Sequence, residues 1–144
     1  MELRKAALIA AITAATAGVL TPPAHAEAGS FQSPSGNIYC LLGAETDGTS
    51  RADCQVQQHT YPVPPPGDCH LGGWGGQFSV KQGDPVELVC QGGVLTGPPM
   101  PTLGYGETRS IGAITCKSEP VGVTCTDDST GHFFRASRDS YQLG

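Results

Sequence analysis

The sequence predicts an all-β fold, a small antiparallel sandwich or barrel-like meander with disulfides and Gly/Pro-rich loops. Three observations predict it. The chain of 144 residues contains 20 glycines and 12 prolines, which interrupt it every few residues. Between these breaks lie short runs in which apolar and polar residues alternate, the pattern of half-buried antiparallel strands. Six cysteines, an even number in a small chain, indicate the disulfide framework of an exported protein.

The N-terminal residues predict a removable signal peptide over residues 1–26. Two basic residues precede an apolar run at residues 6–20, and a small-x-small cleavage site ends at Ala26, with a second one ending at Ala28. The apolar run is shorter than the about 20 residues that a membrane-spanning helix needs. We therefore expect one domain over residues 27–144, secreted or held in the cell envelope, with no membrane span.

Seven alternating runs predict the strands. In chain order they are NIYCLL, ADCQVQ, QFSV, VELVC, SIGAITC, GVTCT and HFFRAS. The first is entered from a Ser-Pro-Ser-Gly turn, and QFSV pairs with VELVC as a hairpin about KQGDP, with Phe78 and Val80 on one face. Two Pro-rich segments, 61–69 and 97–106, are expected as extended loops because proline cannot donate to a strand ladder.

The segment TCKSEPVGVTCT predicts a hairpin closed by a disulfide. With Pro120 and Val121 as a two-residue turn, Cys116 lies opposite Cys125 in a non-hydrogen-bonded pair, where Cα atoms are about 4.5 Å apart. A disulfide spans that distance. A type I turn with a G1 bulge at Gly122 would instead shift the register by one residue and send the sulfur atoms to opposite faces. The cysteines favour the unbulged register.

The other four cysteines are paired by their proximity in sequence. This predicts bonds between Cys40 and Cys54 and between Cys69 and Cys90. Zinc is the competing interpretation, but the sequence contains no C-x2-C or H-x3-H spacing and no C-x-x-C redox motif. We therefore expect no metal and no cofactor.

The turn TDDSTGH contains Asp127, Ser129 and His132, the residue types of a hydrolytic triad. Triad members normally converge from separate elements, whereas these three share one loop, and no G-x-S-x-G elbow surrounds the serine. Asp127 and Asp128 also lack the D-x-[DN]-x-[DN]-G spacing of a calcium loop. We therefore predict a structural turn with a left-handed exit at Gly131, and no catalytic residue.

Charge and aromatic residues narrow the choice of partner. The formal net charge is −5 and no run of Lys or Arg follows residue 5, which excludes nucleic acids and anionic lipids because both select clustered positive charge. The candidate binding surface consists of Trp74, Tyr105 and Tyr61, aromatic residues on Gly/Pro-rich loops. Trp74, between two pairs of glycines, is either a platform for a sugar or peptide or a plug of the core, and Tyr105 has the same two interpretations.

A set of motifs in a fixed order resembles a known family. The motifs are SPSGNIYC, ADC, PPPGDC, GWG, LGYGET and CKSEPVGVTC followed by STGHFFRASRDSY, and together they run from Phe31 to Leu143. They are similar to those of a family of small secreted actinobacterial proteins, mycobacterial ones included, that is known as a domain of unknown function. The resemblance implies export and a cysteine-linked β domain. It implies no reaction, ligand or catalytic residue.

We expect a non-enzymatic binding or interaction module that acts outside the cytoplasmic membrane. Its partner would be an extracellular protein or an envelope glycan, met through the Pro-rich loops around Trp74 and Tyr105. One alternative is an inhibitor of an extracellular hydrolase that uses a rigid Pro-rich loop as bait. The other is a small hydrolytic enzyme that uses the turn at Asp127.

Overall fold

The computed structural model describes Gly18 and residues 29–95 and 100–144, and this part of the chain contains ten strands and no helix. The strands are β1 (Gly29–Gln32), β2 (Ile38–Ala44), β3 (Ser50–Val56), β4 (Gln77–Lys81), β5 (Glu87–Leu88), β6 (Thr108–Ile111), β7 (Ile114–Glu119), β8 (Gly122–Asp127), β9 (Phe133–Ala136) and β10 (Tyr141–Leu143). Apart from Gly18, the predicted signal peptide lies outside the described residues, as do both predicted cleavage positions. Within the described ranges no helix is long and apolar enough to cross a membrane.

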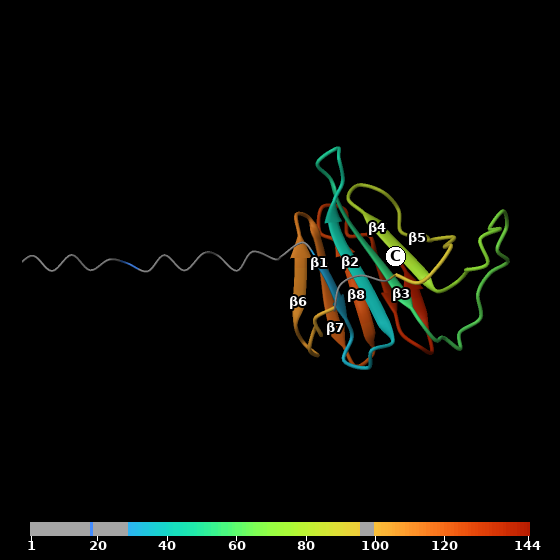
Figure 1. Ribbon diagram of the computed structural model, residues 1–144. Coiled ribbons are helices and arrows are strands. Elements are labelled where there is room, and N and C mark those ends of the chain that lie inside the picture. The colour runs from blue at the N-terminus through green and yellow to red at the C-terminus, as the bar shows by residue number, and fades with distance from the viewer. Residues whose placement is uncertain (1–17, 19–28, 96–99) are drawn as a thin grey trace, which may run out of the picture.

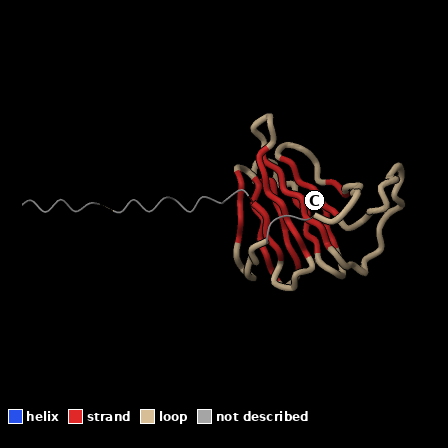
Figure 2. The backbone as a smooth tube through the Cα atoms, viewed as in Figure 1, coloured by secondary structure: helices blue, strands red, loops and turns tan. Residues whose placement is uncertain are grey.

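The strands form two five-stranded antiparallel sheets that pack face to face (Figures 1 and 2). One sheet has the order β1-β2-β3-β4-β5 and the other the order β10-β9-β8-β7-β6, so each sheet is a meander of consecutive strands. Across the sandwich, β2 contacts β6, β3 contacts β7, and β4 contacts β8 and β9. The predicted all-β class is therefore confirmed in its sandwich form.

The register of the β7–β8 hairpin is the unbulged one. Glu119 pairs with Gly122, so Pro120 and Val121 form a two-residue turn, and Cys116 lies directly opposite Cys125. Their Cα atoms are 4.0 Å apart and the two sulfur atoms are bonded. The prediction from the cysteine spacing is confirmed.

The run SIGAITC is not one strand, and that prediction is wrong. The chain reverses at Gly112 and Ala113, so that Ile111 pairs with Ile114 and the run is divided between β6 and β7. Gly112 has φ of 51°, a left-handed conformation that glycine adopts without steric cost. Ile111 and Ile114 are three residues apart, so the apolar positions before and after the turn do not share the period of two of a single strand.

The two Pro-rich segments form loops, as predicted, where the structure describes them. Residues 61–69 contain no strand, and residues 100–106 form only an isolated bridge in which Thr102 lies beside Gln32 at the edge of β1. Residues 97–99 of the second segment lie outside the described part. The strands β1 and β10 belong to none of the seven predicted runs.

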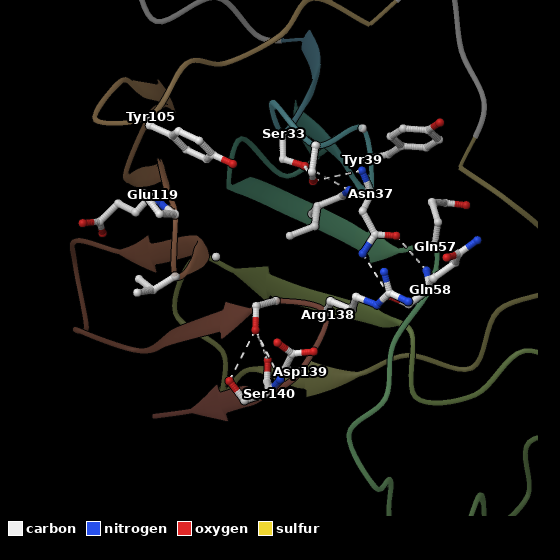
Figure 3. A pocket seen from close by; sticks show the side chains of 17 residues that line it. Ser33, Asn37, Tyr39, Gln57, Gln58, Tyr105, Glu119, Arg138, Asp139 and Ser140 are labelled. Atoms are coloured by element: carbon white, nitrogen blue, oxygen red, sulfur yellow. Dashed lines mark hydrogen bonds between the residues drawn. The ribbon is translucent and has the colours of Figure 1, made fainter.

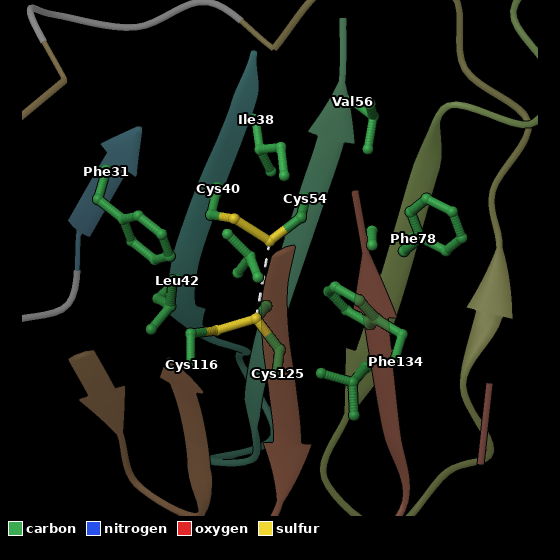
Figure 4. Close-up of a cluster of buried hydrophobic side chains, with 14 of the residues drawn as sticks. Phe31, Ile38, Cys40, Leu42, Cys54, Val56, Phe78, Cys116, Cys125 and Phe134 are labelled. Carbon is green, nitrogen blue, oxygen red and sulfur yellow. Dashed lines mark hydrogen bonds between the residues drawn. A yellow bond between two sulfur atoms is a disulfide. The ribbon is translucent and has the colours of Figure 1, made fainter. Parts of the chain in front are cut away.

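The core lies between the sheets and is filled from both of them (Figure 4). Phe78 of β4 and Phe134 of β9 are both fully buried, with ring centroids 5.6 Å apart. Phe31 of β1 is also fully buried, and the guanidinium of Arg109 on β6 lies 5.9 Å from its ring centroid. Arg109 further donates to the carbonyl oxygen of Ser30 at 3.0 Å, which joins the two sheets along this edge.

All three predicted disulfides are present. Two of them, Cys40–Cys54 and Cys116–Cys125, each join neighbouring strands of one sheet, and all four of these cysteines are fully buried. The sulfur atoms of Cys54 and Cys125 approach each other to 3.6 Å from opposite sheets (Figure 4), which places both bridges at the centre of the core. The third bond, Cys69–Cys90, anchors the loop between β3 and β4 to the chain beyond β5.

Candidate functional site

A groove of about 810 Å³ lies at one end of the sandwich (Figure 3). It is lined by residues 33, 35–39, 57, 58, 105, 119–122 and 137–140, and we call it the turn groove. These residues belong to the connections that follow β1, β3, β5, β7 and β9, together with adjoining strand ends. In an antiparallel meander every second connection returns to the same end, so the topology gathers these segments there.

The wall formed by the β1–β2 turn is fixed by hydrogen bonds. The amide of Gly36 donates to the carbonyl oxygen of Ser33 at 2.8 Å, and the amide of Ile38 donates to the Ser33 hydroxyl at 3.1 Å. The side chain of Asn37 binds the backbone of Gln58, donating to its carbonyl oxygen and accepting from its amide, both at 2.9 Å. Asn37 therefore ties the turn to the end of β3 and positions the groove.

The opposite wall, the β9–β10 turn, is also held by its backbone. The amide of Ser137 donates to the carbonyl oxygen of Ser140 at 2.9 Å, which closes the turn. The amide of Thr60 donates to the carbonyl oxygen of Arg138 at 2.8 Å, and this bond links the two sheets at the groove end. The two walls are therefore held mainly by main-chain hydrogen bonds, with the side chains of Asn37 and Ser33 as additional contacts.

Four side chains are left free to meet a ligand. Among the described residues no hydrogen bond engages the hydroxyls of Tyr39 and Tyr105, the amide of Gln58 or the guanidinium of Arg138. Tyr105 is 53 % exposed, and Arg138 extends from its turn toward Asn37 and Gln58 (Figure 3). The groove thus offers hydrogen-bond donors, acceptors and aromatic surface that the fold does not use.

The charge of the groove is mixed. Arg138 supplies one positive charge, and Glu119 and Asp139 supply two negative charges. Glu119 also lies 3.9 Å from the ammonium group of Lys117, and Asp139 accepts a hydrogen bond from the Thr60 hydroxyl at 3.3 Å. No single sign of charge dominates, so the groove does not provide the field that selects polyanions or polycations.

At the opposite end of β8, the turn at Asp127 is a hydrogen-bonded latch. The buried carboxylate of Asp127 accepts from the amide and hydroxyl of Ser129 at 2.9 and 2.6 Å, from the Thr130 hydroxyl at 2.9 Å, and from the amide of Gly83 at 2.7 Å. Burial alone would raise the pKa of Asp127, but these hydrogen bonds outweigh it and lower the pKa from 3.8 to about 2. Since Gly83 lies between β4 and β5, the latch joins the two sheets.

This geometry differs from that of a catalytic triad. A triad histidine lies between the serine and the acid, accepting from one and donating to the other. Here Ser129 donates directly to Asp127, and within the described residues no hydrogen bond of the His132 ring reaches either of them. Gly131 has φ of 84°, so the predicted left-handed exit is confirmed.

Comparison with protein families gives a match over residues 8–143 to a family of unknown function, DUF6636. The chain belongs to this family. The match spans nearly all of the sequence and confirms the resemblance to a family of unknown function. The chain matches no curated protein and no solved structure. DUF6636 membership therefore brings no ligand or reaction, and the groove is interpreted from its own residues.

In this DUF6636 chain the predicted binding residues are separated. Tyr105 lines the turn groove. Trp74 is half-buried in the β3–β4 connection, where its indole N–H donates to the carbonyl oxygen of Pro64 at 2.8 Å, so it braces the Pro-rich loop and lies outside the groove lining.

Tyr61 does not belong to a binding surface, and that prediction is wrong. Its side chain is only 6 % exposed, its hydroxyl donates to the carbonyl oxygen of Gly75 at 2.7 Å, and its ring packs against Phe78 and Tyr141. Burial raises the pKa of Tyr61, and Tyr141 adds to this effect. The sequence places Tyr61 at the start of a Pro-rich loop, but the loop folds back so that the ring closes one end of the DUF6636 core.

Sequence reasoning missed Asn37, Gln58 and Arg138. Each belongs to a short polar turn, and polar turn residues carry no signal of their own because most turns contain them. The usable signal is topological, since these turns all follow odd-numbered strands and so share one end of the DUF6636 sandwich.

Proposed function

We propose that the protein is a non-catalytic binding module that acts outside the cytoplasmic membrane and receives its ligand in the turn groove. The observation that carries this proposal is that one set of groups holds the groove walls and a different set of side chains faces the space between them. The walls are held by main-chain hydrogen bonds and by Asn37, while no other described residue forms a hydrogen bond with the side chains of Tyr39, Gln58, Tyr105 and Arg138. A preformed hollow with a few convergent polar and aromatic groups is the usual form of a ligand site.

Two features support action outside the cytoplasm. Three disulfides are compatible with an oxidising compartment, where such bonds form and persist. The leader over residues 1–26 has the composition of an export signal, and the motifs resemble those of secreted actinobacterial proteins. Both features agree with a partner located in the envelope or beyond it.

The Asp127 turn supports a non-catalytic role. A triad aspartate accepts a hydrogen bond from the histidine ring, whereas among the described residues no hydrogen bond joins the His132 ring to Asp127. Its carboxylate is already occupied by four donors, two from Ser129 and one each from Thr130 and Gly83. The Asp127 carboxylate therefore holds its own turn through Ser129 and Thr130 and joins the two sheets through Gly83.

Co-sedimentation with purified cell envelopes tests the proposal. We expect the exported protein to sediment with envelopes of its own organism, and the double variant Tyr105→Ala, Arg138→Gln to lose at least tenfold in the bound fraction. Both side chains are exposed, so the variant should fold normally. Val94→Ala, at an exposed residue outside the groove lining, is the matched control and should sediment like the wild type. Equal sedimentation of the groove variant and the wild type contradicts the proposal.

Inhibition of an extracellular hydrolase is the second candidate function, and it is favoured by an exposed apolar residue in the loop between β3 and β4. The Cys69–Cys90 bond anchors this loop, and two residues beyond Cys69 the side chain of Leu71 is 63 % exposed. An exposed apolar residue beside a covalent anchor suits the primary pocket of a protease. If the loop acts as bait, the wild type slows a subtilisin-type protease and Leu71→Ala does not, whereas the groove variant still inhibits.

A further inference from the structure

We infer that the turn groove binds an uncharged oligosaccharide, a short stretch of envelope glycan. This inference rests on the proposed function and names the chemical class of its ligand. Size is the first support. The groove volume of about 810 Å³ falls within the about 300–1,000 Å³ of sites that take small ligands. A few sugar units fit such a volume, whereas a folded protein domain does not enter it.

The charge of the groove favours an uncharged ligand. A phosphorylated or sulfated ligand is best held by several cationic donors, and among the described lining residues Arg138 is the only Lys or Arg. Glu119 and Asp139 also line the groove and would repel such a ligand. Arg138 in turn would repel a strongly cationic ligand. The mixed charges therefore act against ions of either sign and leave hydrogen bonding as the means of recognition.

The free polar groups match the hydroxyls of a sugar. A tyrosine hydroxyl both donates and accepts, and so does the amide of Gln58 taken as a whole. A sugar hydroxyl also does both, so each hydroxyl that enters the groove can find a partner at Tyr39, Gln58 or Tyr105. Arg138 adds donors for ring and glycosidic oxygens, which only accept. Figure 3 shows Tyr39 and Tyr105 on two sides of Asn37, so the groups are distributed along the groove rather than gathered at one point.

Tyr105 provides the apolar part of the contact. Its ring is 53 % exposed and has glycine on both sides in the chain, Gly104 and Gly106, so no neighbouring side chain hinders approach to the ring. One face of a pyranose presents C–H groups, which pack against an aromatic face while the hydroxyls remain hydrogen-bonded at the edge. A single exposed tyrosine beside polar groups is the arrangement that such a ligand requires.

The backbone of the groove argues against an extended peptide. Peptides bind to β-sandwiches most simply by adding a strand to a free sheet edge, which needs unpaired amides and carbonyls in a row. The groove is walled by turns, and their backbone groups already bind one another, as in Gly36 to Ser33, Ser137 to Ser140 and Thr60 to Arg138. A glycan, which meets side chains rather than a strand edge, suits these walls better.

The experiment uses the exported, oxidised protein labelled with ¹⁵N and follows amide shifts during titration. The probes are chitotetraose, mannotetraose and laminaritetraose as neutral tetrasaccharides, a heparin-derived tetrasaccharide as a charged sugar, and a mixture of octapeptides. We expect at least one neutral tetrasaccharide to shift amides of residues 35–39, 57–58 and 137–140. We expect Tyr105→Ala to weaken that binding at least tenfold, Tyr105→Phe to weaken it less because the ring remains, and Val94→Ala, at an exposed residue outside the groove lining, to leave it unchanged.

The other outcomes overturn the inference in distinguishable ways. Groove shifts with only the heparin fragment show that the ligand is charged. Groove shifts with only the octapeptides replace the glycan by a peptide and leave the proposed function standing. If no neutral tetrasaccharide shifts the groove while envelope sedimentation still depends on Tyr105 and Arg138, the glycan class is wrong and the binding function remains. If sedimentation is also independent of these residues, both are wrong.

Discussion

Replacing Asp127 with asparagine tests whether the latch between the sheets stabilises the fold. The carboxylate has two donors on each oxygen, Ser129 with its amide and hydroxyl on one, and Gly83 and Thr130 on the other. An asparagine amide has one oxygen and one NH₂ group, so one pair of donors would face another donor. Two of the four hydrogen bonds are therefore lost, and one of the lost pair comes from a backbone amide.

The magnitude follows from the kind of bond that is lost. A hydrogen bond to a charged group contributes about 1.5–3 kcal/mol. The loop around the buried carboxylate is itself exposed at Gly83, Ser129 and Thr130, so water can reach part of the freed donors. We expect Asp127→Asn to lower the free energy of unfolding by about 2–4 kcal/mol. A loss of this size lowers Tm by about 10 °C in a domain of this length.

The pH dependence of stability provides a second measurement. The pKa of Asp127 in the folded protein is about 2, below its ordinary value of 3.8, so its contribution is fully present above about pH 4 and is lost as the pH falls toward 2. Asp127→Asn should lack this part of the acid transition. The pKa of Asp47 is also lowered to about 2, chiefly by the Thr49 hydroxyl, but it titrates in both proteins and cancels in the comparison.

Urea unfolding of wild type and variant at pH 7, 4 and 2.5 is the assay, with Asp128→Asn as the matched control. Asp128 is exposed and its carboxylate accepts from the Thr115 hydroxyl at 2.7 Å, so its replacement should cost less than about 1 kcal/mol. The reasoning is refuted if Asp127→Asn unfolds within about 0.5 kcal/mol of the wild type at pH 7. It is equally refuted if both proteins lose the same stability between pH 4 and 2.5.

Three further predictions concern the core and its turns. Replacing Cys40 and Cys54 together by alanine should lower the free energy of unfolding more than replacing Cys69 and Cys90. Each pair loses about 3 kcal/mol of loop-closure stabilisation, but only the first replacement opens a cavity in the core. Equal losses in urea unfolding contradict this. Gly122→Ala should lower Tm strongly, since a Cβ there meets the carbonyl group of Ala136 at φ of 132°, while Gly43→Ala, with open space, should lower it far less. Tyr61 should ionise above the ordinary range of a tyrosine in an ultraviolet titration, because burial raises its pKa, and Tyr61→Phe should remove that step.

Much of the fold was predictable because strand alternation and cysteine register are local properties. The pairing of Cys116 with Cys125 followed from counting outward from a two-residue turn, and the structure has that register. The division of SIGAITC was missed because the run contains no Pro, Asn or Asp to mark a turn, and the spacing of three between Ile111 and Ile114 was the remaining signal. Because that turn, β1 and β10 were not predicted, the number of strands was wrong. The sequence therefore could not show which connections lie at the same end of the sandwich.

The site was less predictable for the same reason. Tyr105 stood out because an aromatic residue between glycines is unusual, whereas Asn37 and Arg138 are ordinary turn residues until the topology brings their turns together. Tyr61 was predicted to belong to an exposed binding surface, but it is buried. The chain direction after it is decided by the hydrogen bond of its hydroxyl to Gly75 and by packing on Phe78, which are long-range contacts that no local pattern contains.

The two central disulfides occupy corresponding positions in the first and second parts of the chain. Residues 29–88 build one sheet and residues 108–143 the other, and in each half the bond joins the second strand to the third. Each of these bonds therefore closes a hairpin whose partners are 14 or 9 residues apart, at a small cost of loop closure. Oxidation can proceed in either half before the halves meet. A single backbone cut between residues 91 and 107 would leave every disulfide within one fragment, so the protein is suited to reconstitution from two separately oxidised pieces.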